Sequence, residues 1–138
     1  MQMNVHLNFH GTCADAFELY KKVFGAKNAF AVKYGDAPAG QPVPPDWNDK
    51  IMHTSIPLGD GLLMGCDAPP ERSTPIGGFQ ISVQSKHEAE VNRIYEALKT
   101  GGSVQMPIGP TFWSPMFGMC TDKFGVAWMV GMPGPGQQ

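Results

Sequence analysis

The sequence of 138 residues contains few cysteines and no pair of closely spaced ones. Cys13, Cys66 and Cys120 are odd in number, lie far apart and form no Cys-x-x-Cys motif, which excludes a disulfide framework and the usual zinc and redox motifs. Three reduced thiols fit the cytoplasm, where disulfides are rare. We therefore interpret all three cysteines as packing residues.

Positive charge and long apolar segments are also scarce. Ten Lys and Arg residues stand against twelve Asp and Glu residues, for a formal net charge of -2, so the chain has no basic stripe to neutralise phosphates. The first nine residues lack the features of a signal peptide, and no stretch approaches the ~20 apolar residues that span a bilayer. We expect a cytoplasmic protein with neither a nucleic-acid nor a membrane partner.

Glycine and proline, by contrast, are abundant, with 17 and 13 residues, which is typical of a chain with many turns. Four of the prolines fall between residues 35 and 50 and predict a loop there, because proline cannot donate a hydrogen bond in a sheet centre. The length suits one domain, which we place at residues 1–131, followed by a flexible tail at 132–138.

The order of predicted elements is the same in both halves of the chain. Alternation of apolar and polar residues at 5–9 predicts a strand, and a helix follows from a Thr12–Asp15 cap to Gly25. Residues 28–34, 51–58 and 62–66 predict three more strands. The pattern therefore indicates a βαβββ module at residues 1–67.

The second half begins with alternation at 79–83 and continues with a helix that runs from a Ser85–Glu88 capping box to the glycines at 101–102. Strands are predicted at 103–106, 114–121 and 126–130, which gives a second module at 78–131. The sequence thus predicts an α+β fold of two βαβββ modules. Each module leaves an apolar sheet face that the other module or a second chain must cover.

Four segments carry a family resemblance: residues 8–11 (NFHG), 20–25 (YKKVFG), 111–113 (TFW) and 122–129 (DKFGVAWM). Together with the paired modules they resemble the vicinal oxygen chelate superfamily of glyoxalases, bleomycin resistance proteins and extradiol dioxygenases, and more narrowly its PhnB-like branch. The resemblance implies two incomplete barrels that each cup a cavity, commonly in a homodimer. It implies no single reaction, so function depends on the site.

In metal-using relatives the ligands come from the first and last strands of each half, and the resemblance places these positions near His6, Met64, Gly78 and Met129. Of these residues only His6 suits a hard or borderline cation, because glycine has no side chain and a thioether prefers soft metals. No predicted strand carries a carboxylate. We therefore predict that the chain has no metal site and no cofactor.

Alternation places His6 and Asn8 on the cavity side of the first strand, and Gln80 and Ser82 on that side of the second module. The thioethers of Met64 and Met129 and the aromatic rings of Trp113 and Phe117 would complete a pocket of mixed polarity. The two aromatic residues could instead belong to the core or to a dimer interface. The predicted ligand-binding set is His6, Asn8, His53, Met64, Gln80, Ser82, Trp113, Phe117 and Met129.

Three functional hypotheses follow. The favoured one is a homodimeric, metal-independent protein that binds a small, partly apolar organic molecule. The alternative is an enzyme of the same superfamily, with either histidine acid-base catalysis or a rearranged metal site of His6, His10 and His53 completed by Asp46 or Asp49. A third is a structural dimer with a vestigial cavity. No nucleophile motif is evident, so no catalytic residue is assigned.

Overall fold

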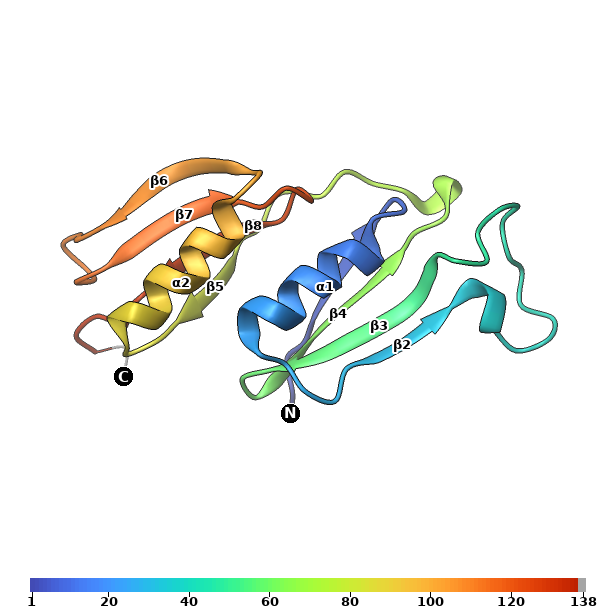
Figure 1. The fold of residues 1–138 in the computed structure, drawn as a ribbon, viewed down its shortest axis with the longest axis horizontal. Coiled ribbons are helices and arrows are strands. Elements are labelled where there is room, and N and C mark those ends of the chain that lie inside the picture. The colour runs from blue at the N-terminus through green and yellow to red at the C-terminus, as the bar shows by residue number, and fades with distance from the viewer. Residues whose placement is uncertain (137–138) are drawn as a thin grey trace. The chain divides into compact units, whose positions relative to one another are not determined.

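The computed structural model describes residues 1–136 and has the predicted α+β class (Figure 1). The chain divides into two compact units, residues 1–76 and the segment from Gly77 onward. Each unit contains one α-helix and one open sheet of four strands. Within the described residues no helix is long and apolar enough to cross a membrane.

In the first unit, α1 lies against a sheet whose order is β1-β4-β3-β2. The parallel pair is β1 with β4, and the other neighbouring strands are antiparallel. Two short 3-10 turns, Tyr34–Asp36 and Pro70–Arg72, follow β2 and β4. The main elements are β1 (Val5–Phe9), α1 (Cys13–Phe24), β2 (Phe30–Lys33), β3 (Ile51–Leu58) and β4 (Gly61–Asp67).

The second unit repeats this topology with the order β5-β8-β7-β6, in which β5 and β8 form the parallel pair. Its elements are β5 (Ile81–Gln84), α2 (Glu88–Lys99), β6 (Ser103–Gly109), β7 (Phe117–Thr121) and β8 (Ala127–Gly131). The predicted βαβββ order is therefore present in both halves.

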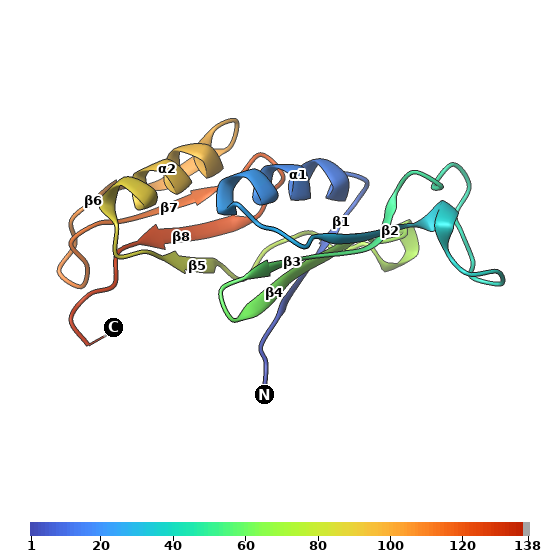
Figure 2. The same ribbon diagram turned by 60° about the horizontal axis from the view of Figure 1, so that its bottom comes forward.

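In each unit the helix covers one face of the sheet (Figure 2). Leu7, Phe9 and Leu63 are buried on the covered side of the first sheet, and Trp128 and Val130 on that of the second. Each covered face includes a strand glycine that a helix aromatic approaches closely. A methyl group at Gly65 would lie 2.6 Å from the Phe17 ring, and one at Gly118 would lie 2.9 Å from the Tyr95 ring.

Neither predicted helix cap forms. Thr12 and His87 precede the two helices without a side-chain capping bond. At α1 the backbone N–H groups of Gly11 and Cys13 instead donate to Oδ1 of Asp67, at 2.8 and 3.0 Å. The Thr12–Asp15 prediction was wrong, since Thr12 forms no side-chain capping bond, and a carboxylate more than fifty residues away binds the backbone on both sides of Thr12. The predicted Ser85–Glu88 box was wrong because α2 starts only at Glu88.

The strand β7 begins at Phe117, three residues later than predicted, because Ser114 belongs to a loop and not to the strand. Its hydroxyl donates to the backbone carbonyls of Met116 and Met132, which closes a loop instead of extending the strand. The backbone N–H of Met132 also donates to the carbonyl of Met116. The predicted flexible tail at 132–138 stays a prediction, and its last two residues lie outside the described residues.

Candidate functional site

The face of each sheet opposite its helix carries a row of aligned side chains. In the first unit His6 pairs with Met64, Met64 with Ser55, and Ser55 with Phe30, so the row crosses all four strands. Directly paired residues of neighbouring strands point to the same face. The strand alternation that buries Leu7 and Phe9 under α1 therefore turns His6 and Asn8 to the open face.

His6 and His53 come together on this open face although their strands, β1 and β3, are separated by β4. The two imidazole rings stack with centroids 6.1 Å apart and an interplanar angle of 19°. The ring of Phe30 lies 6.3 Å from that of His53. Partial burial, and then the nearby His53, lower the pKa of His6. Because the ordinary value is about 6.5, His6 is mainly neutral at pH 7.

Asn8 and Cys66 extend the open face beyond the histidine pair. They are paired across β1 and β4, and the Cys66 thiol donates to Oδ1 of Asn8 at 3.3 Å. Burial, and then the charge of Asp67, raise the pKa of Cys66, so the group is a neutral thiol at pH 7. This end of the face offers an amide and a thiol to a ligand, but no thiolate nucleophile.

The corresponding row in the second unit is rich in methionine. Ser82 pairs with Met129, Met129 with Met119, and Met119 with Met106. Beside the row, the Phe117 ring contacts Trp113 at a centroid distance of 5.4 Å, and Trp113 contacts the 96% exposed Phe112 at 4.7 Å. The second open face is therefore soft, apolar and aromatic.

The structure groups eight of the nine predicted site residues into two sets. His6, Asn8, His53 and Met64 share the open face of the first unit, and Ser82, Trp113, Phe117 and Met129 lie on or beside that of the second. Gln80 is exposed and lies just before β5.

Sequence reasoning missed four residues that complete the rows: Phe30, Ser55, Met106 and Met119. Met119 was missed because the predicted turn at 122–125 would pair Thr121 with Val126 and so place Met119 opposite Trp128, whereas Thr121 pairs with Ala127. Met106 was missed because the pairing of β6 with β7 shifts register between Val104 and Met106.

The prediction that no strand carries a carboxylate was wrong, because Asp67 is the last residue of β4. It is 1% exposed, and besides the two donors at the start of α1 it accepts the backbone N–H of Ile51 at Oδ2, 2.9 Å away. Three N–H groups therefore satisfy this carboxylate. It holds the fold together and is turned away from the open face.

The open-face residues do not suit the divalent ion of metal-using relatives. Ser82, not Gly78, lies opposite Met129, because Gly78 precedes β5 in the connecting segment; the placement of Gly78 at a ligand position was wrong. These positions carry an imidazole and a thioether in the first unit, and a hydroxyl and a thioether in the second. Neither pair contains the anionic oxygens that balance a hard cation. In the described part of the chain no three His, Cys, Asp or Glu side chains are grouped to hold a metal.

His10 does not join the histidine pair, as the rearranged metal site would require. Its ring nitrogens instead lie 2.8 Å from the Ser73 hydroxyl and 3.0 Å from the carbonyl oxygen of Thr74. His10 therefore links the end of β1 to the segment after β4 through hydrogen bonds.

Comparison with known proteins identifies the family. Residues 6–130 match the Glyoxalase/Bleomycin resistance protein/Dioxygenase superfamily. The chain belongs to this superfamily. It is 29% identical to Protein YjdN of Escherichia coli K12 over 141 residues, covering 94% of each chain. The crystal structure of protein PA1353 from Pseudomonas aeruginosa is 44% identical, with a TM-score of 0.88 over 96% of this chain and 98% of that one.

A more distant structure shares the fold. The PhnB protein of Bacillus cereus has a TM-score of 0.76 at 21% identity, over 96% of this chain and 99% of that one. The predicted resemblance to the superfamily and the predicted fold of two βαβββ modules with open sheets are confirmed. The family and the fold still leave the reaction open, because superfamily members with one fold differ in chemistry.

Proposed function

We propose that the protein binds a small, partly apolar organic molecule on its open sheet faces, and that it does so without the divalent ion of its metal-using relatives. The observation that carries the proposal is the meeting of His6 and His53 on an open face, where the Phe30 ring lies near His53 and Met64 pairs with His6. Small-molecule sites combine apolar and aromatic walls with a few placed polar groups, and this face has that composition.

The lining favours a planar ligand with one hydrogen-bonding group. The stacked imidazoles and Phe30 offer flat surfaces to an aromatic ring. A neutral His6 can either donate or accept a hydrogen bond, and Asn8 supplies an amide beside it. A phenol or an aromatic ketone satisfies both requirements.

Binding of 4-nitrophenol, observed through the imidazole signals of the histidines by NMR, tests the proposal. We expect the signals of His6 and His53 to shift together and saturably, while the His87 signal stays fixed because His87 lies at the start of α2. A His53→Ala variant should weaken binding about tenfold or more, since it removes one of the two flat polar surfaces.

Two controls make this experiment decisive. His87→Ala removes an exposed histidine outside the face and should leave the affinity unchanged. The proposal fails if a broad panel of phenols and aromatic ketones leaves the signals of His6 and His53 fixed, or if His87→Ala weakens binding as much as His53→Ala does.

The second candidate function is acid-base catalysis by the same histidine pair, as in the alternative hypothesis. The lowered pKa of His6 favours it, because a neutral imidazole at pH 7 can take a proton from a bound ligand. Exchange of the α-protons of a bound ketone for deuterium would measure this activity. Catalysis requires exchange that His6→Gln abolishes, whereas a pure binding protein gives only the background rate.

A further inference from the structure

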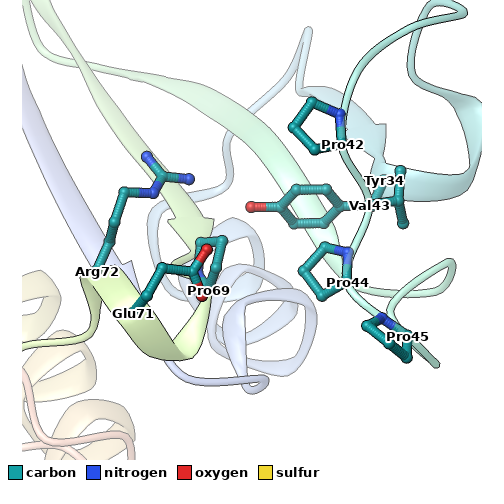
Figure 3. Close-up of a pocket in the computed structure, with 8 residues that line it drawn as sticks. All are labelled: Tyr34, Pro42, Val43, Pro44, Pro45, Pro69, Glu71 and Arg72. Carbon is teal, nitrogen blue, oxygen red and sulfur yellow. The ribbon is translucent and has the colours of Figure 1, made fainter.

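A cavity of about 470 Å³ lies in the first unit and contains none of the predicted site residues (Figure 3). One wall is the proline-rich loop at residues 42–45, and the other is formed by Pro69, Glu71 and Arg72 after β4. Tyr34 lies between the two walls, with its hydroxyl directed towards the second. The volume falls within the range of small-molecule sites, roughly 300 to 1,000 Å³.

The floor of this cavity is held in place by bonds on several sides. Tyr34 is 5% exposed, and its hydroxyl donates to the backbone carbonyl of Asp67 at 2.9 Å. Its backbone N–H donates to the carbonyl of Lys50 at 2.9 Å, and its ring packs edge-on against Trp47 at 5.5 Å. Burial, and then the nearby Cys66, raise the pKa of Tyr34, so the hydroxyl keeps its proton at neutral pH.

The apolar wall is also restricted in conformation. Pro42, Pro44 and Pro45 each fix one backbone dihedral, so the loop loses less entropy when a ligand orders it than a flexible loop would. Together with Pro69 and the Tyr34 ring they form flat apolar surfaces that suit an aromatic ring.

Two opposite charges stand at the second wall. Glu71 and Arg72 are exposed neighbours that line the cavity, and neither forms an ion pair among residues 1–136. A simple anion would be attracted by Arg72 and repelled by Glu71, and a simple cation would meet the reverse. A ligand that carries both charges is favoured by both residues.

We propose that this cavity binds a free aromatic α-amino acid. The carboxylate of the ligand pairs with Arg72 and its ammonium group with Glu71, while the aromatic ring packs against Tyr34 and the prolines at 42–45. Arg72 provides a planar fork of donors that matches a carboxylate. This site goes beyond the proposed function, because it shares no residue with the open face that carries His6 and His53.

Isothermal titration with L-phenylalanine tests the site, with 3-phenylpropionate and phenethylamine as ligands that each lack one charge. We expect saturable binding of phenylalanine with a Kd on the order of 1 mM or tighter, and binding of each analogue at least about tenfold weaker. Arg72→Gln should weaken phenylalanine binding about tenfold. Glu71→Gln should weaken it similarly and bring 3-phenylpropionate close to phenylalanine in affinity.

The controls separate this site from the open face. Both substitutions are at exposed positions, so circular dichroism should show a native fold, and Lys86→Gln, at an exposed position in the other unit, should change nothing. His6→Ala should also leave phenylalanine binding intact. The proposal is overturned if phenylalanine gives no saturable heat, if 3-phenylpropionate binds the unsubstituted protein as well as phenylalanine does, or if Arg72→Gln has no effect. Loss of binding in His6→Ala would overturn it too.

Discussion

The open faces of the two units share a topology and differ in chemistry. In the first unit the row across the sheet runs His6, Met64, Ser55, Phe30, and in the second it runs Ser82, Met129, Met119, Met106. In both rows a methionine of the unit's last strand pairs with a residue of its first strand: Met64 with His6, and Met129 with Ser82. Imidazole and hydrogen-bonding groups thus concentrate in one unit and thioethers in the other, so the repeated fold carries two different surfaces.

The covered faces of the sheets differ less. Each unit contains one buried aspartate whose Oδ1 accepts two backbone N–H groups and whose Oδ2 accepts a third N–H. Asp67 serves Gly11, Cys13 and Ile51. Asp122 serves Phe124, Val126 and the indole of Trp128. The same chemistry stabilises a helix start in one unit and a hairpin turn in the other.

Replacing either aspartate by alanine should have the largest effect, because each change leaves three N–H donors without their charged acceptor. We expect Asp67→Ala and Asp122→Ala each to lower the free energy of unfolding by about 3–5 kcal/mol, measured by urea denaturation. Asp60→Ala, in the exposed turn between β3 and β4, is the matched control and should cost less than about 0.5 kcal/mol. A loss below about 1 kcal/mol for Asp67→Ala would contradict its structural role.

A smaller loss of stability is expected at the two strand glycines against which an aromatic side chain of the helix packs. Gly65→Ala would press on Phe17 and Gly118→Ala on Tyr95, so each should cost about 1–3 kcal/mol by the same measurement. Gly77→Ala is the control, because a methyl group there meets nothing within 4 Å. Equal stability of the Gly65→Ala and Gly77→Ala variants would contradict the close contact between Phe17 of α1 and Gly65 of β4.

The histidine pair predicts an effect of pH on the stability of the first unit. Because the pKa of His6 is lowered on folding, the unfolded chain binds more protons below about pH 6.5. The contribution of neutral His6 to the free energy of unfolding is therefore complete above that pH, and it is lost as the pH falls towards the lowered pKa. An NMR titration should give His6 a midpoint below 6.5, and His53→Gln should raise it only in part, because burial is the larger cause. A midpoint at or above 6.5 would refute the partly buried pair.

The smallest effect concerns the thiols. Burial is the first cause that raises the pKa of all three cysteines, and it raises that of Cys120 to about 11. A disulfide reagent at pH 8 should therefore react with the native protein more slowly than with free cysteine, and with the partly exposed Cys66 first. Cys66→Ser should remove that first phase. Rapid labelling of Cys13 in the native state would show that the start of α1 opens.

Local patterns were enough to predict the repeated topology, because alternation and helical stripes depend on near neighbours. The strand at Ile51–Leu58 was predicted with the bounds that it has. The bonds at the start of α1 were not predicted, because the N–H groups of Gly11 and Cys13 donate to Asp67, which is distant in sequence. The strand carboxylate was missed because the predicted strand ended at Cys66, one residue before the end of β4. The meeting of His6 and His53 was stated only as an alternative, since it requires the strand order β1-β4-β3.

The central proposal is that the chain has the fold of the family and binds its ligand without the family's divalent ion. Titration of metal-free, untagged protein with Mn²⁺, followed by the paramagnetic broadening of the His6 and His53 signals, tests it most directly. We predict no saturable broadening up to about 100 µM Mn²⁺, because the ligand position that pairs with His6 carries the thioether of Met64 and no carboxylate. Binding of one equivalent with micromolar affinity, abolished by His6→Ala, would contradict the account.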